Sequence, residues 1–78
     1  SVAQALAVVE VLRALVEHFA ERPRDIRRGV EADPGSPEAL RAAVSWIGGM
    51  TDRYAFDTAI RVLDWPIERL PKGIERTL

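Results

Sequence analysis

The segment at residues 2–20 constrains the fold most, because it has the spacing of a helix and is apolar around most of its circumference. Apolar residues recur there at intervals of three and four, at positions 2, 5, 6, 9, 12, 16 and 19. Val8, Val11 and Leu15 widen this stripe. A helix on the surface of a small bundle needs an apolar face of roughly 100°. The face predicted here is nearly twice as wide, so we expect neighbours to cover this helix on two sides.

Two further helices are predicted from their start and stop signals. Residues 36–37 are Ser-Pro, which places a serine at the N-cap and a proline at the first helical position. The glycine pair at 48–49 is typical of a helix end, and we expect one of these glycines to be left-handed. Thr51 or Asp52 then caps the next helix, and the Asp-Trp-Pro sequence at 64–66 stops it.

These segments predict an all-α fold, a small helical bundle of three main helices with one or two short C-terminal turns. The chain of 78 residues is long enough for one domain. We expect helices at about 2–21, 37–48 and 52–63, a mobile loop at about 29–35, and a tail at 72–78 along the surface. The chain begins within a helical pattern and without an initiating Met, so we expect residues 1–78 to be a single helical domain of a longer protein.

Composition excludes several classes of function. The chain has no cysteine and one histidine, which excludes a thiolate site and a centre built from several histidines. No apolar run approaches the roughly 20 residues that span a bilayer, and no secretory leader opens the sequence. We expect no metal, no cofactor and no membrane contact in this segment, and a cytoplasmic location.

Four arginines lie close together after the first helix, which raises the question of an anion or nucleic-acid contact. They are Arg22, Arg24, Arg27 and Arg28. Four acids accompany them, at Glu21, Asp25, Glu31 and Asp33. Since these acids nearly cancel the local field, we favour a solvated loop, and the net charge of −1 gives no general attraction to nucleic acid.

The residues do not form a self-sufficient catalytic site, and we expect no catalytic residue in this chain. His18 lies at the edge of the apolar face of the first helix, where a boundary position explains it better than a general base. No glycine-rich loop followed by Lys and Ser or Thr is present to hold phosphates.

The most distinctive string is WIGGMTDRYA at residues 46–55. It resembles the signature near the C-terminus of deoxyguanosine triphosphate triphosphohydrolase-like proteins, members of the HD-domain phosphohydrolases, in which it reads approximately DYIAGMTDRYA. The match is continuous from Gly49 to Tyr54. Ser45, Trp46 and Gly48 depart from the family string, so any role of the acid usual at position 45 is in doubt.

This resemblance implies a non-catalytic C-terminal helical domain that supports a catalytic HD domain or a subunit interface. The parent would be an oligomer that uses a divalent metal, held by upstream His and Asp ligands, to cleave a deoxynucleoside triphosphate into deoxynucleoside and triphosphate. The motif residues Gly48, Gly49, Met50, Thr51 and Asp52 would then form a structural corner. Arg53 and Tyr54 are candidates for contact with substrate, although a buried structural network would explain them too.

Two alternatives come from other classes of function. The chain could be a free-standing helical interaction module that dimerises through Val8, Val11 and Leu15, because three helices cannot cover so wide an apolar face. It could instead contact nucleic acid through residues 22–28.

Overall fold

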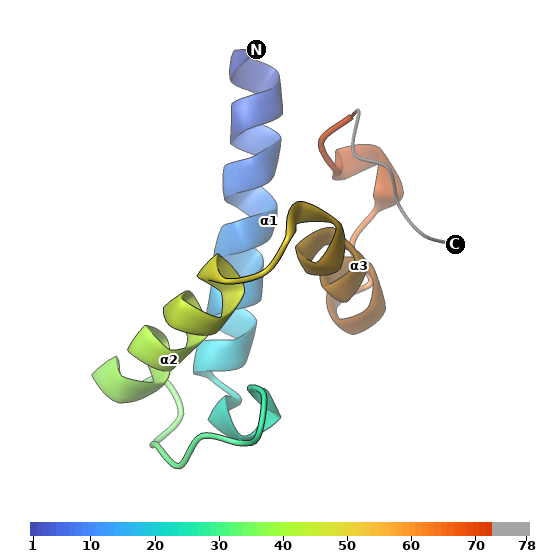
Figure 1. The fold of residues 1–78 in the computed structure, drawn as a ribbon. Helices are drawn as coiled ribbons and strands as arrows, with labels where there is room; N and C mark the ends of the chain where they lie inside the picture. The colour runs from blue at the N-terminus through green and yellow to red at the C-terminus, as the bar shows by residue number, and fades with distance from the viewer. Residues whose placement is uncertain (73–78) are drawn as a thin grey trace.

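The computed structural model describes residues 1–72 and shows the predicted all-α fold (Figure 1). Three α-helices span Val2–Ala20 (α1), Pro37–Gly48 (α2) and Asp52–Leu63 (α3). Single turns of 3₁₀ helix precede α2 and follow α3, at Pro23–Asp25 (η1) and Ile67–Arg69 (η2). No strand occurs within residues 1–72. Residues 73–78, which belong to the tail expected along the surface, lie outside the described residues.

Helix α1 begins and ends at local signals in the sequence. Ser1 is its N-cap, and the Oγ atom of Ser1 accepts the backbone N–H of Gln4 at 3.2 Å. At the other end, Arg22 precedes Pro23 and has φ −136° and ψ 62°, outside the helical region. The helix therefore ends at Ala20, one residue before the expected boundary.

The core lies between the C-terminal half of α1 and the inner faces of α2 and α3. Val11 and Leu15 of α1 and Phe56 of α3 are the largest fully buried side chains. Ala43 of α2 and Ala59 of α3 have no exposed surface, and their small side chains let the helices approach closely. Figure 1 shows α2 and α3 beside the C-terminal half of α1, whereas its N-terminal half extends beyond α2.

The C-terminal turn packs beside the N-terminal half of α1. Arg69 forms an ion pair with Glu10 at 2.9 Å, and its guanidinium lies 4.2 Å from the centre of the Trp65 ring. The side chain of Gln4 also donates a hydrogen bond to the backbone carbonyl of Lys72. These contacts cover a part of α1 that α2 and α3 do not reach.

The connection between α1 and α2 is anchored by backbone hydrogen bonds near both of its ends. The N–H of Val30 donates to the carbonyl of Pro23 at 2.9 Å, and the N–H of Gly35 donates to the carbonyl of Ala20 at 2.8 Å. Gly35 has φ 73°, a left-handed conformation that favours glycine. The mobility expected for residues 29–35 stays a prediction.

Candidate functional site

The corner between α2 and α3 contains the motif singled out from the sequence, and capping hydrogen bonds form it. The backbone N–H of Gly49 bonds to the carbonyls of Ser45 and Trp46, each at 3.2 Å, which closes α2. Thr51 then caps α3, because its Oγ atom accepts the backbone N–H of Tyr54 at 3.2 Å. One helix therefore ends and the next begins within a few residues.

Neither glycine of this corner has the left-handed backbone that we expected. Gly49 has φ −87° and ψ −4°, a right-handed conformation open to any residue, so that expectation is wrong. The reason is that the turn continues right-handed from α2 directly into the cap at Thr51. A Cβ atom at Gly49 would meet only two carbonyl oxygens, at 3.6 and 3.7 Å, and one at Gly48 would meet nothing within 4 Å.

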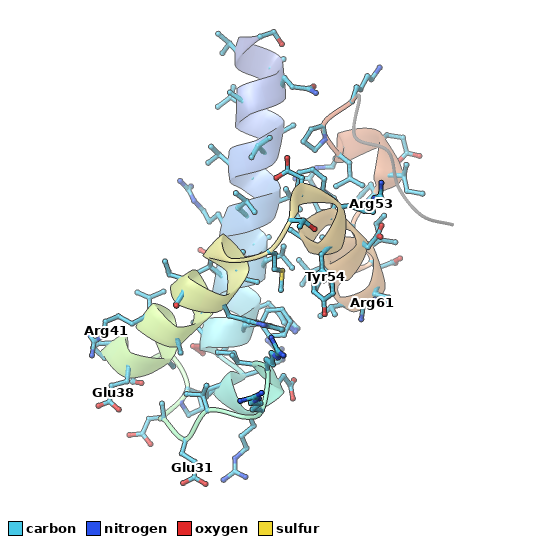
Figure 2. All side chains as sticks on the ribbon, in the orientation of Figure 1. Glu31, Glu38, Arg41, Arg53, Tyr54 and Arg61 are labelled. Carbon is cyan, nitrogen blue, oxygen red and sulfur yellow. The ribbon has the colours of Figure 1, made fainter. Side chains whose placement is uncertain are left out.

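Arg53 and Tyr54, the candidates for substrate contact, leave α3 in different directions (Figure 2). Successive residues of a helix project about 100° apart, which separates the two side chains. Tyr54 is 53% exposed and lines two adjoining clefts. Arg53 is exposed and lines neither of them. The structure therefore brings Tyr54 to a concave surface and places Arg53 outside it.

The larger cleft lies between the η1–α2 connection and the corner, and we call it the corner cleft. It has a volume of about 1050 Å³. Its polar and aromatic lining comes from Arg27, Arg28, Ser45, Trp46, Thr51 and Tyr54. No Asp or Glu lines it. The cleft is thus cationic on one wall and aromatic on the other.

A smaller cleft of about 350 Å³ adjoins the corner cleft, and the two share Trp46 and Tyr54. We call it the His18 cleft, since His18, Asp25 and Arg61 bring titratable groups to it. Figure 2 shows Arg61 on the same side of α3 as Tyr54, and their spacing of seven residues places them about two helical turns apart. The shared rings thus separate the two concave regions of this side of the molecule.

The imidazole of His18 lies in a partly buried position beside Arg22. Burial lowers the pKa of His18 below 6.5, the charge of Arg22 lowers this pKa further, and Asp25 opposes the change. A guanidinium nitrogen of Arg22 donates to the backbone carbonyl of His18 at 3.2 Å and lies 3.3 Å from the ring Nδ1 atom. Because a guanidinium can only donate, the ring contact requires Nδ1 without a proton.

The described residues do not fit the divalent metal that the family resemblance implies for a parent enzyme. Within residues 1–72, no three His, Asp or Glu side chains come together as metal ligands. Catalytic metal centres need such a set of donors, so a metal of the parent enzyme would take its ligands from outside residues 1–72. In the same part of the chain, no helix is both long and apolar enough to cross a membrane.

The interface expected at Val8, Val11 and Leu15 is contradicted by burial. Val11 and Leu15 have no exposed surface, and Val8 is half-buried against the same core. Val11 and Leu15 belong to the core of their own chain and Val8 packs against that core, so Val11 and Leu15 offer no surface to a second copy. The three helices cover this part of α1, and the apolar surface that they leave uncovered lies at other residues of the same helix.

A different set of apolar residues stays exposed, and we call it the α1–α2 strip. It consists of Val2, Leu6 and Val9 on α1 and Leu40 and Val44 on α2, each between 47% and 77% exposed. Spacings of three and four residues place the members of each helix on one face. Val9 and Leu40 line a common groove of about 500 Å³. Exposed apolar side chains beside such a groove make this strip a candidate interaction surface.

Sequence reasoning missed the corner cleft because it weighed charge along the chain and not in space. Within residues 1–72, neither Arg27 nor Arg28 forms an ion pair with the acids that were expected to balance them. Figure 2 shows Glu31 directed outward at the end of the molecule. No signal in the sequence places Trp46 opposite these arginines, since the two segments meet only through the fold.

Comparison with known protein families finds a match for most of the chain. A family model described as phosphohydrolase-associated domain matches residues 2–61. No curated protein and no solved structure gives a significant match. The matched residues include α1, α2, the corner and most of α3. They therefore contain the whole α1–α2 strip and the whole corner cleft. They also contain the His18 cleft apart from Val62.

Proposed function

Because this chain belongs to the phosphohydrolase-associated domain family, whose domains accompany HD phosphohydrolases, we propose that it is the accessory helical domain of a deoxynucleoside triphosphate triphosphohydrolase. The family match over residues 2–61 is the observation that carries this proposal. The continuous motif from Gly49 to Tyr54 supports the narrower assignment to the deoxyguanosine triphosphate branch. The chain itself contributes no catalytic residue in this proposal.

The α1–α2 strip is the proposed contact with the catalytic HD domain. Val9, Leu40 and Val44 expose about half of their side chains, and burying such groups is favourable at about 25 cal/mol for each Å² of apolar surface. The groove shared by Val9 and Leu40 offers a concave seat for an apolar side chain. Docking there leaves the corner cleft and Tyr54 on other parts of the surface.

The divalent metal and the hydrolytic step belong to the catalytic domain in this proposal. Arg53 and Tyr54 remain candidate substrate contacts, and the position of Tyr54 beside two clefts gives it the stronger support. Arg53 would reach a substrate only from another side of α3 (Figure 2).

The reading frame upstream of Ser1 provides the first test. An arrangement of His, His-Asp and Asp typical of an HD domain supports the proposal, and a frame without these ligands, in a chain with no HD partner, overturns it. The isolated 78 residues should release no triphosphate from dGTP with Mg²⁺ or Mn²⁺. Release by the purified chain would contradict a non-catalytic role.

A pair of variants tests the docking surface in the protein that carries both domains. Replacing Leu40 and Val44 with Glu should weaken the contact and lower triphosphate release from dGTP at least tenfold, while the circular dichroism of the isolated helical domain stays unchanged. Arg41→Glu is the matched control, because it lies on the same helix outside the α1–α2 strip. Equal activity of the two proteins would overturn the proposed docking.

Self-association is the second candidate function, since the same exposed strip could bind a second copy of the chain. Sedimentation of the 78-residue chain separates the two cases. A dimer that Leu40→Glu and Val44→Glu dissociate supports a homodimerisation module. A monomer at high concentration favours the catalytic domain as the natural partner.

A further inference from the structure

The corner cleft has an unusual combination of charge and shape for so small a domain. Its volume of about 1050 Å³ is at the upper end of small-molecule sites. Arg27 and Arg28 form one side, and the corner with Thr51 and Tyr54 forms the other. The two sides come from segments more than twenty residues apart, so the fold creates this surface.

The charge of the cleft comes from its two arginines. Within residues 1–72, Arg27 and Arg28 form no ion pair, and no acid lines the cleft. Two guanidinium groups that line one concave surface raise the local concentration of anions, and their forked donors match phosphate oxygens. The cleft therefore has the electrostatics of a phosphate site.

The backbone at Arg28 supports the same conclusion. Arg28 has φ 68°, and Gly29 beside it has φ 70°. A left-handed conformation is unfavourable for a residue with a long side chain, and a turn that served only the fold would place glycine or asparagine there. An arginine with this backbone conformation beside a cleft therefore points to a role for its side chain.

The opposite wall supplies a rigid aromatic surface and hydroxyl donors. The Trp46 ring packs edge to face against Phe19, with 4.8 Å between ring centres and an angle of 87°. Tyr54 is 53% exposed beside it. Thr51 Oγ accepts a backbone N–H, which leaves its own hydrogen available to a ligand. The absence of a side chain at Gly49 keeps this wall open.

We propose that the corner cleft binds a nucleoside triphosphate, with the phosphates at Arg27 and Arg28 and the base against Trp46 and Tyr54. Exposed aromatic rings stack on bases of any sequence, and arginines bind phosphate through charge-assisted hydrogen bonds. The choice of a deoxynucleotide rests on the proposed function, whereas the anion-and-ring chemistry rests on this chain alone. The site lies on the accessory domain, apart from the upstream ligands of the metal.

Calorimetry on the 78-residue chain tests the site with four probes: dGTP, inorganic triphosphate, deoxyguanosine and a short oligothymidylate. We expect dGTP to bind, inorganic triphosphate to compete with it, and deoxyguanosine to bind at least tenfold more weakly. Absence of dGTP binding, or equal binding of deoxyguanosine, would overturn the proposal. If the oligonucleotide bound more tightly than dGTP, the proposed mononucleotide ligand would be wrong and the cleft would be a site for single-stranded nucleic acid.

Two variants connect binding to the arginines. The double variant Arg27→Gln and Arg28→Gln should weaken dGTP binding at least tenfold. Arg41→Gln is the matched control, because Arg41 lies at the far end of α2 (Figure 2), and it should bind as the unmodified chain does. Equal affinities of the double variant and the control would overturn the site.

Arg28→Gly separates a binding role from a structural one. Glycine relieves the left-handed conformation, so this variant should melt at a higher temperature than the unmodified chain while it binds dGTP more weakly. Unchanged dGTP affinity would overturn the part assigned to Arg28. If the chain did not bind dGTP, the cleft proposal would fail. The proposed function would still be tested independently, by triphosphate release from the two-domain protein.

Discussion

Individual residues in this chain show that a glycine need not be left-handed and that a left-handed residue need not be glycine. Gly48 and Gly49, the pair in the motif, both have conformations and surroundings that would accept a side chain. Arg28, by contrast, has a positive φ that glycine would adopt more easily. Sequence alone predicted the reverse for the glycine pair, because a glycine after a helix is most often left-handed. The identity of the two glycines did not determine their backbone conformation, because the cap of the next helix at Thr51 determined the turn.

Gly48→Ala should therefore stabilise the isolated domain by about 0.5–1 kcal/mol, because alanine is the better helix former and its Cβ atom meets nothing within 4 Å. Gly35→Ala should destabilise the domain by more than about 1 kcal/mol, because Gly35 has φ 73° and a Cβ atom would lie 2.5 Å from the Glu21 carboxylate. Urea denaturation of both variants checks this. Destabilisation by Gly48→Ala would contradict the open space at the corner.

His18 should make folding stability depend on pH. Burial lowers its folded pKa below the 6.5 of the unfolded chain, so the unfolded chain takes up a proton first as the pH falls. The free energy of unfolding should therefore decrease as the pH falls below 6.5, until the folded state is protonated too. His18→Gln, which cannot titrate, should show a smaller decrease between pH 7 and pH 5.5 in urea denaturation. Identical pH profiles would show that Arg22 and burial do not perturb the histidine.

At the scale of elements, capping residues made the helices predictable. The expected ranges of the second and third helices are those found for α2 and α3, because Ser36 and Thr51 each accept a backbone N–H at their helix starts. The candidate site was less predictable, since its walls come from separate elements. Tyr54 could be singled out by its motif, whereas Arg27 and Arg28 could not, because no local pattern shows that a tryptophan will face them.

The cap of α2 gives the prediction at this scale. Ser36→Ala should lower the free energy of unfolding by about 1 kcal/mol, because Ser36 Oγ accepts the backbone N–H of Ala39 at 3.1 Å in a partly buried position. Ser45→Ala makes the same chemical change at an exposed site of the same helix and should be neutral or slightly stabilising. Chemical denaturation compares the two. Similar losses would mean that the cap contributes nothing specific.

The whole molecule divides the wide apolar face of α1 among three environments. Val11 and Leu15 face the core, the C-terminal turn contacts the N-terminal half of the helix through Arg69 and Glu10, and Val2, Leu6 and Val9 remain exposed. Periodicity showed that this helix needed cover on more than one side. It could not show which residues the chain covers itself, because that depends on where α2 and α3 cross α1. The predicted interface therefore fell on core residues, and the exposed strip was found only in the fold.

This division predicts very different costs for two leucines on one helix. Leu15→Ala should remove about 2–5 kcal/mol of stability, since Leu15 has no exposed surface and a cavity would remain. A single core in a domain of this size supplies only roughly 3–5 kcal/mol, so this variant should be largely unfolded at 37 °C. Leu6→Ala, at a side chain that is 58% exposed, should change stability by about 0.5 kcal/mol or less. Far-ultraviolet circular dichroism and tryptophan fluorescence measure both. If Leu15→Ala stayed folded while Leu6→Ala unfolded, the exposed strip and not the core would hold the helices together, and the docking surface proposed for it would be lost.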